Sequence, residues 1–272
     1  MMKTRNKIIW IIVGLIASLL WIYPFWIIVI NSLKSQIGIF SDTLGLPKQF
    51  VWSNYPTSLS QLDIISTGLS SLLITISALI LLILASSMAA YALSRNRRKL
   101  SSGIYFLIAV GLLVPFQAIM IPLVAQFGQA NMLNRPGLIF MYVGLGTSMA
   151  TFLYYGALRG IPMALDEAAI MDGANPFQVY WRVIMPLLSP TTVTVIVLNS
   201  LWFWNDYLLP SITINRPGML TIPLKMFQFF GTFGTQWNMA LPALVIVVLP
   251  IIILFVILQR WVVKGITEGA TK

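Results

Sequence analysis

The 272-residue chain contains neither cysteine nor histidine. Disulfide bonds are therefore excluded, and so are metal sites and catalytic machinery built on a thiolate or an imidazole. Charged residues are also scarce, at 9% of the chain, whereas they make up about 25% of an ordinary soluble domain. A soluble globule of this length would lack the charge to cover its surface, which excludes a soluble enzyme or binding domain.

No sequence of the form G-x-x-x-x-G-K-[ST] occurs, so the chain lacks a P-loop for ATP, and uphill transport would take its energy from a partner. Ion-coupled carriers usually place an ionisable residue at membrane depth. Here only Asp206 falls within an apolar segment, near its end, which argues against a proton relay. Sodium can be held by carbonyl and hydroxyl oxygens, so a stand-alone ion-coupled carrier stays open as an alternative. The seven acidic residues offer no catalytic constellation for a membrane-embedded enzyme.

Apolar sequence, in contrast, is abundant, at 58% of the residues. A helix needs about 20 mostly apolar residues to cross a bilayer. Six segments meet this need, namely residues 8–30, 64–93, 102–127, 137–158, 191–209 and 241–258. We predict an all-α fold, a single transmembrane domain of six helices over residues 1–272, with Pro115 and Pro122 kinking the third helix. The first span is longer than the core of a secretory signal, and we expect it to stay uncleaved.

Small hydroxyl residues are frequent in the second span. They are Ser70, Ser71, Thr75, Ser77, Ser86 and Ser87. Small residues allow membrane helices to approach closely, which predicts a packing face. A polar path for a substrate is the alternative interpretation.

The lysines and arginines are unevenly divided between the two sides of this six-span topology. Twelve of the 17 lie on the side that carries both termini. The other five are Lys34, Lys48, Arg135, Arg216 and Lys225. Because cytoplasmic loops carry the excess of lysine and arginine, we expect both termini in the cytoplasm. The net charge of +10 then reflects topology rather than a nucleic-acid-binding surface.

The cytoplasmic loop 159–190 is too polar to cross a membrane, and its first half predicts a short helix over residues 163–172. Asp166 and Glu167 fall in the opening turns, where acidic side chains complement the positive end of the helix dipole. Gly173 follows as a natural stop, because glycine adopts positive φ without strain.

The second half of the loop predicts another helix of about ten residues. Asn175 supplies the cap, Pro176 the first helical position, and Pro186 the end. An apolar stripe at positions i, i+3, i+4 and i+7 is formed by Phe177, Tyr180, Trp181 and Ile184. Such a stripe suits a helix that lies on the bilayer or on its own spans, and equally one that docks in a partner's groove. The local pattern leaves both interpretations open.

A longer pattern runs through this loop. The stretch Glu167–Ala174 reads E-A-A-I-M-D-G-A, and nine residues separate Gly173 from Val183, the start of V-I-M-P. This pattern resembles the EAA motif of permease subunits in binding-protein-dependent ABC importers, E-A-A-x-x-x-G, nine residues, then I-x-L-P. Val183 and Met185 depart from the usual isoleucine and leucine but remain apolar.

The resemblance extends over essentially the whole chain. Asp172-Gly173-Ala174 is the form typical of the sugar-importing branch, and Trp204-Asn205-Asp206 looks like its W-N-[DE]. Thr221-Ile222-Pro223 is similar too. The ending Gln259–Ala270 looks like Q-R-x-x-V-x-G-L-T-x-G-A, with isoleucine for leucine at position 266 and Glu268 at a variable place. The likeness is to the second maltose-type permease subunit of the carbohydrate uptake family 1.

The resemblance implies a type I importer permease in the bacterial cytoplasmic membrane, which moves a sugar, specifically an oligosaccharide, by alternating access. Its implied partners are a second permease subunit, two ATPase subunits that use ATP and Mg, and an extracytoplasmic sugar-binding protein. The chain itself is then not an enzyme, and it binds no cofactor, metal or nucleic acid. An importer of glycerol phosphate or a polyol, from the same family, is the alternative.

The resemblance also implies roles for particular residues. The residues expected to couple to the ATPase are Glu167, Ala168, Ala169, Asp172, Gly173 and Pro186, and the tail 264–272 is expected at the ATPase dimer. The outer loop 228–236 is expected to enter the binding protein through Gly231, Thr232, Phe233 and Gly234, with interfacial re-entry as the alternative. Candidate substrate-path residues are Asn199, Trp202 and Asn205, with structural packing as the alternative role of the tryptophan.

Overall fold

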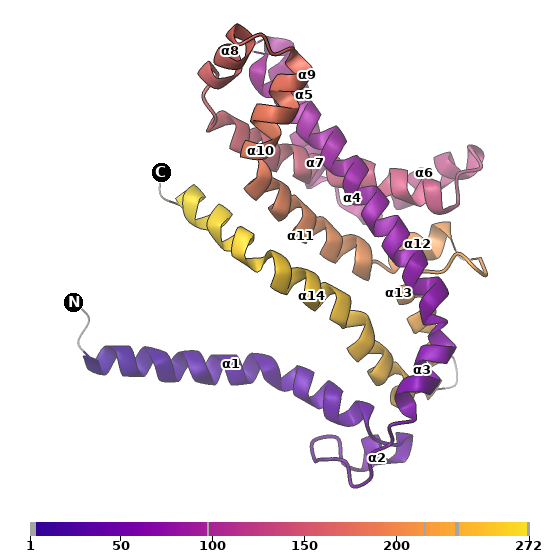
Figure 1. Cartoon of the computed structure of the whole chain (residues 1–272). Coiled ribbons are helices and arrows are strands. Elements are labelled where there is room, and N and C mark those ends of the chain that lie inside the picture. The colour runs from indigo at the N-terminus through magenta and orange to yellow at the C-terminus, as the bar shows by residue number, and fades with distance from the viewer. Residues whose placement is uncertain (1–3, 97, 215, 232–233, 271–272) are drawn as a thin grey trace. The chain divides into compact units, whose positions relative to one another are not determined.

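The computed structural model describes residues 4–96, 98–214, 216–231 and 234–270, drawn as a ribbon in Figure 1. The chain divides into two compact units. The first unit comprises Met1–Ile65 and Lys225–Pro250, and the second comprises Ser66–Leu224 and Ile251–Lys272.

The first unit is built around one long helix and a set of short elements. Its elements are α1 (Thr4–Ser32), α2 (Gln36–Ser41), α3 (Asn54–Leu62), η3 (Phe227–Phe229), β1 (Phe230–Gly231), β2 (Gly234–Thr235) and the start of α14 (Trp237–Ala270). The two strands pair antiparallel, Phe230 with Thr235. Gln36 joins α2 to this region, because its side chain donates to the Thr235 carbonyl at 2.7 Å and accepts from the Asn238 N–H at 3.1 Å.

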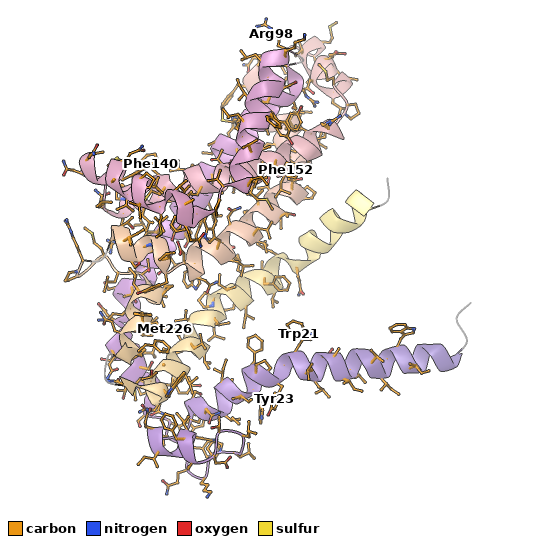
Figure 2. The ribbon with its side chains drawn as sticks, turned by 180° about the vertical axis from the view of Figure 1, so that it is seen from behind. Trp21, Tyr23, Arg98, Phe140, Phe152 and Met226 are labelled. Atoms are coloured by element: carbon orange, nitrogen blue, oxygen red, sulfur yellow. The ribbon has the colours of Figure 1, made fainter. Side chains whose placement is uncertain are left out.

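Helix α1 exposes apolar side chains on every face. Its residues 9–26 are all exposed, and Trp21 has 77% of its surface free. Figure 2 shows the side chains of Trp21 and Tyr23 projecting from this helix. A helix that is apolar all round suits a hydrocarbon environment rather than water. Pro24 is accommodated inside it, as in many membrane helices.

The second unit holds most of the helices. They are α4 (Ile64–Arg95), α5 (Lys99–Val110), η1 (Gly111–Leu113), α6 (Phe116–Gln129), α7 (Arg135–Arg159), α8 (Ala164–Met171), α9 (Pro176–Gln178), the π-helix η2 (Val179–Ile184), α10 (Met185–Leu187), α11 (Ser189–Asn205), α12 (Leu208–Thr213) and α13 (Ile222–Met226). The core lies between α4, α7 and α11, with side chains such as Leu82, Tyr154 and Val195 fully buried.

Close approach in this core depends on a glycine. A Cβ atom at Gly146 of α7 would lie 3.1 Å from Leu82 and 3.2 Å from the Asn199 Oδ1 atom. Small residues at helix contacts allow this kind of packing in membranes. The serines of α4 also serve packing, because Ser70, Ser71 and Ser87 are buried and hydrogen-bonded within the unit.

The all-α fold predicted from the sequence is confirmed. Among the described residues, four helices are long and apolar enough to cross a membrane, Ile9–Ser32, Ile64–Arg95, Arg135–Arg159 and Trp237–Gln259. The count reaches six when two bent helix pairs are each taken as one span.

The third predicted span, residues 102–127, is far more bent than a kinked helix. The segment Lys99–Leu113 meets α6 at 106°. The break lies at Pro115, which has extended backbone (ψ 135°) and precedes α6, whereas Pro122 sits inside α6. Proline also disfavours a helical conformation in the residue before it, and Val114 is extended accordingly (ψ 113°).

The fifth predicted span, residues 191–209, ends earlier than expected. Helix α11 stops at Asn205, and Asp206 takes an extended conformation (ψ 129°) before α12 begins. At its other end, α11 meets the segment Pro176–Leu187 at 72°.

Candidate functional site

Helix α8 is the first helix of the loop 159–190, and its ends follow from its sequence. Asp166 and Glu167 occupy the first turn, as predicted. At the other end Gly173 has a φ of +86°, its N–H donates to the Ile170 carbonyl at 2.9 Å, and the Ala174 N–H donates to the Ala169 carbonyl at 3.0 Å. This pair of bonds is a Schellman motif, which needs a left-handed residue and therefore favours glycine.

The predicted coupling residues lie on different faces of α8. Glu167, Ala168, Asp172 and Gly173 are exposed, whereas Ala169 is partly buried against the core of the second unit. Large apolar side chains accompany the exposed set. They are Leu165, Ile170, Met171 and, from the start of the second helix, Phe177. The loop thus presents an apolar surface with carboxylates beside it.

Asp166, which the sequence analysis placed only as a dipole partner, is buried with 7% of its surface exposed. It faces the last turns of α4, which lie beside α8 (Figure 1). The Tyr91 hydroxyl donates to Asp166 Oδ1 at 2.7 Å, and Arg95 Nη2 forms an ion pair with Asp166 Oδ2 at 2.8 Å. Arg95 Nη1 also donates to the Ile161 carbonyl at 3.1 Å. The spacing of Tyr91 and Arg95, i and i+4, places both on one helix face and was the available sequence signal.

The second helix of the loop begins as predicted. Asn175 and Gln178 form a capping box, in which each backbone N–H donates to the other side chain at 2.9 Å. The helix then widens into the π-helix η2. Tyr180 of this segment is buried, shares a 2.6 Å hydrogen bond with Ser87, and packs its ring 5.5 Å from that of Tyr91.

Two expectations for this helix need correction. Pro186 is not its last residue, because the helical segments continue one residue further, to Leu187. The apolar stripe is also divided between two environments. Tyr180 and Ile184 are buried within the second unit, whereas Phe177 is 67% exposed. Trp181 joins the two parts, because its ring lies 6.0 Å from that of Phe177 and 5.1 Å from that of Tyr180.

The three candidate substrate-path residues do not come together. Asn199 is buried, and its side-chain amide donates to the Val195 carbonyl of its own helix at 2.9 Å. Asn205 is exposed and donates to the Leu201 carbonyl at 2.8 Å. Trp202, 39% exposed, lines a cavity of about 340 Å³ at the bend between η1 and α6. The other lining residues are Gly111, Leu112, Val114, Phe116, Ile119, Gly144, Leu145 and Ser148.

The W-N-D triplet, Trp204-Asn205-Asp206, lies where α11 ends and contacts neighbouring elements of the second unit. Trp204 is buried, and the Tyr142 hydroxyl of α7 donates to Asp206 Oδ2 at 2.9 Å. Asp206 Oδ1 accepts the Leu208 N–H at 3.0 Å, which starts the turn into α12. The triplet therefore terminates α11 and ties that end to α7.

The predicted binding-protein loop contains the β1–β2 hairpin. Gly231 pairs with Gly234, whose φ is +153°. Thr232 and Phe233 lie outside the described residues. The same holds for the side chains of the predicted tail 264–272, and for residues 271–272 altogether.

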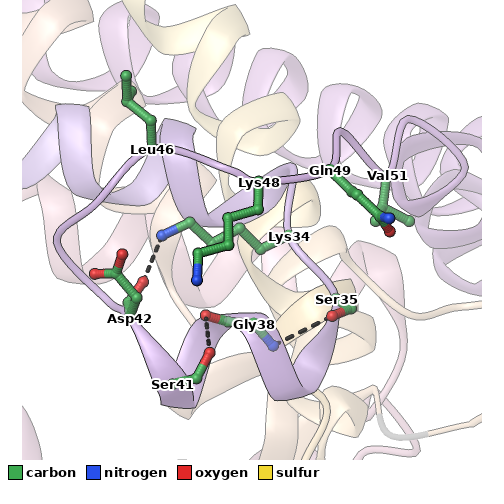
Figure 3. Close-up of a pocket in the computed structure, with 9 residues that line it drawn as sticks. All are labelled: Lys34, Ser35, Gly38, Ser41, Asp42, Leu46, Lys48, Gln49 and Val51. Atoms are coloured by element: carbon green, nitrogen blue, oxygen red, sulfur yellow. Dashed lines mark hydrogen bonds between the residues drawn. The ribbon is translucent and has the colours of Figure 1, made fainter.

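The first unit contains a polar cavity of about 380 Å³ in the segment after α1 (Figure 3). Lys34 is buried beside it, and its ammonium group donates to the Asp42 carbonyl at 2.6 Å and to the Gly45 carbonyl at 2.7 Å. Lys34 thus holds the 42–45 turn in place, and Lys48 also lines the cavity. In the described part of the chain, no group of three or more acidic residues has the arrangement of a metal site.

Comparison with known proteins finds a matching family model and similar proteins. Residues 81–268 match the family model described as "Binding-protein-dependent transport system inner membrane component". The chain is 48% identical over 259 residues to the probable starch degradation products transport system permease protein AmyC of Thermoanaerobacterium thermosulfurigenes, covering 95% of this chain and 94% of that protein. It is 31% identical to the multiple sugar-binding transport system permease protein MsmG of Streptococcus mutans, over the full length of both.

A solved structure has the same fold. It is a chain of a bacterial ABC transporter involved in the import of the acidic polysaccharide alginate. The TM-score is 0.82, with 22% sequence identity and with 96% of this chain and 98% of that chain covered.

Proposed function

This chain belongs to the family of inner membrane components of binding-protein-dependent transport systems, and from that premise we propose that it is a permease subunit that imports an oligosaccharide. Members of the family are multi-pass membrane permeases rather than enzymes, and they act together with other subunits. The proposal also covers the partner subunits, the orientation in the membrane, the transported sugar and the residues that serve each of these roles.

The observation that carries the proposal is the surface of the loop 159–190. Helix α8 exposes Glu167 and Ala168 beside the apolar side chains Ile170 and Met171, and Phe177 extends this surface. An amphipathic helix that presents apolar anchors suits a groove on a partner protein. Because the chain lacks a P-loop, a partner ATPase is the source of energy that this surface fits.

We assign the loop to the cytoplasmic side, with both termini there, on the distribution of lysine and arginine. Two ATPase subunits would bind ATP and Mg and close on each other. The exposed Glu167 would face cations of the ATPase, while Ala168 would allow close contact and Gly173 would hold the turn. A second permease subunit would complete the pore, and an extracytoplasmic binding protein would deliver the sugar.

An oligosaccharide is the cargo that the relatives favour. AmyC is named for starch degradation products and MsmG for multiple sugars, whereas nothing here favours glycerol phosphate or a polyol. Trp202 supports a sugar, because it lines a cavity and an aromatic face packs on sugar C–H groups. The Ser148 hydroxyl at the same cavity could bond a sugar hydroxyl.

The test is a mild-detergent pull-down of the tagged chain from its native membrane, with the captured proteins identified by mass spectrometry. An ATPase subunit and a second permease should accompany the native chain, and the ATPase should be lost from a Glu167→Lys, Gly173→Val double variant. The purified complex in liposomes, supplied with the binding protein, should take up a short starch-derived oligosaccharide only when ATP is present on the ATPase side. A chain that is captured alone and moves solute without ATP would contradict the proposal.

A further inference from the structure

Two adjacent acidic residues of α8 have opposite surroundings. Glu167 is exposed, whereas Asp166 is buried and faces α4. Among the described residues of α8, Asp166 alone makes side-chain polar contacts with another helix. Ala169 and, just after the helix, Ala174 are partly buried against the apolar core of the second unit.

Arg95 connects several segments at this point. It forms the ion pair with Asp166, and its Nη1 atom donates to the carbonyls of Ile161 at 3.1 Å and Leu158 at 3.4 Å. One guanidinium therefore bridges the end of α4, the end of α7, the segment that leads to α8, and α8 itself. The rigid fork of donors on arginine suits such a junction.

Tyr91 connects both halves of the loop. Its hydroxyl binds Asp166 of α8, and its ring packs 5.5 Å from the ring of Tyr180 in η2. The Arg95 guanidinium lies 5.9 Å from the centre of the same ring. The Asp166 carboxylate accepts one hydrogen bond, from the Tyr91 hydroxyl at Oδ1, and its other oxygen faces Arg95 in the ion pair.

Burial makes this cluster stiffer than a surface ion pair. The Arg95 and Asp166 side chains are only 15% and 9% exposed, so salt screens their attraction little. Removing either partner would leave the other charge buried without compensation. The cluster therefore favours a single arrangement of α8 against α4.

We propose that Asp166 is a positioning residue that locks α8 to the C-terminal end of α4, so that movement of α8 by an ATPase subunit moves α4 instead of deforming the loop. This inference rests on the function proposed above. The two acidic residues then have different roles. Glu167 faces the partner ATPase, and Asp166 holds the helix of its own chain.

The test uses the complete importer in liposomes, with this chain, its partner permease, both ATPase subunits and the binding protein. The quantity measured is the number of ATP molecules hydrolysed per sugar imported. For Asp166→Asn we expect this ratio to rise by about tenfold, because the neutral side chain no longer compensates the buried Arg95 guanidinium. The ATPase should remain bound in the pull-down, unlike in Glu167→Lys. Arg98→Gln removes a nearby exposed charge and should leave the ratio unchanged.

A double-variant cycle shows whether the two residues act through each other. Arg95→Gln should raise the ratio as Asp166→Asn does, and the double variant should be no worse than either single variant. Full additivity would mean independent roles and would overturn the proposal. If Asp166→Asn fails to insert, Tyr91→Phe removes one hydrogen bond at nearly constant volume, and a smaller rise in the ratio is expected.

Covalent rescue separates positioning from a merely structural role. Because this chain has no cysteine, Arg95→Cys and Asp166→Cys can be joined by a short bifunctional thiol reagent in a complex whose other subunits are also cysteine-free. Joining the two sites should restore the low ratio that the unjoined double variant has lost. A joined complex that no longer transports would mean that α4 and α8 must separate, which overturns the proposal.

The remaining outcomes are also decisive. An unchanged ratio in Asp166→Asn would overturn the inference, and so would loss of the ATPase from that variant, because Asp166 would then serve docking itself. A native complex without ATP-dependent uptake would overturn the proposed function together with the inference. The native complex therefore tests the function, and the variants test Asp166.

Discussion

The two ends of α4 are each fastened by an arginine, but to different kinds of partner. Near the N-terminal end, Arg135 of α7 donates to the Ser70 hydroxyl at 3.0 Å and to the Gly218 carbonyl. Near the C-terminal end, Arg95 faces the carboxylate of Asp166 at 2.8 Å. One arginine thus meets neutral groups, and the other meets a charge.

At the N-terminal end of α4, the hydrogen bonds are shared among several backbone groups of the segment 218–222. Ser70 donates to the Met219 carbonyl at 3.1 Å, and Ser71 accepts the Ile222 N–H at 2.9 Å. Losing one such bond leaves the others in place. At the C-terminal end, the polar contact between α4 and α8 passes through one carboxylate, Asp166, next to the hydrogen bond between Ser87 and Tyr180 of η2. Under the proposal above, the first end maintains structure, whereas the second transmits movement.

The largest effect is expected from disrupting the turn at Gly173 that ends α8. Gly173→Val places a β-branched residue at a φ of +86°, a conformation that costs such residues on the order of 1–3 kcal/mol, and it should abolish ATP-driven uptake while leaving membrane insertion intact. Uptake into liposomes and the amount of inserted chain are the measurements. Gly68→Ala, at an α4 position with open space for a Cβ atom, is the matched control and should transport normally. Uptake retained in Gly173→Val would mean that the turn is not needed for coupling.

The comparison of the two arginines can be tested directly. Arg95→Met leaves Asp166 buried and uncompensated, and it should destabilise the chain by about 3 kcal/mol. Arg135→Met removes bonds to neutral acceptors and should cost about 1–2 kcal/mol. Thermal unfolding in detergent compares the two, and only Arg95→Met should also speed proteolysis within the loop 159–190. Equal losses of stability, with no difference in loop proteolysis, would remove the distinction between the two ends.

The middle of α4 packs Leu82 against Gly146 of α7, and substitution there should have a smaller effect than the loss of Arg95. Gly146→Ala pushes a methyl group toward Leu82 and Asn199, so we expect a loss of about 1–2 kcal/mol from overpacking. Thermal unfolding is again the measurement. Pairing Gly146→Ala with Leu82→Val, which vacates space on the facing helix, should recover part of the loss. A fully additive double variant would show that the two side chains do not compete for that space.

Local sequence chemistry predicted local structure well. The apolar runs predicted the long helices, Gly173 predicted the end of α8, and Asn175 predicted the cap of the next helix. Each of these depends on residues within one or two turns. The resemblance of the EAA-like motif to importer permeases also predicted the family that the comparisons show.

Features that depend on contacts between distant residues could not be predicted from local sequence. The sequence predicts only a helix-dipole role for Asp166, because its contact Tyr91 lies 75 positions away. Asn199 is buried, and its Oδ1 atom would lie 3.2 Å from a Cβ atom at Gly146 of another helix. The 106° bend at Pro115 exceeds what a proline imposes on a helix, since the chain leaves the helical conformation there altogether.

The smallest expected effect lies away from both ends of α4, at the cavity lined by Trp202. Trp202→Ala removes an aromatic face that we propose contacts the sugar, so the KM for uptake should rise by about tenfold, the equivalent of roughly one aromatic contact. The ATP hydrolysed per sugar should stay as in the native complex, because α8 and α4 remain locked. Trp202→Phe keeps a ring and should recover most of the affinity, which a purely structural role would not require. A raised ratio of ATP to sugar in Trp202→Ala would place Trp202 in the coupling path, and the cavity would lose its assignment as a sugar contact.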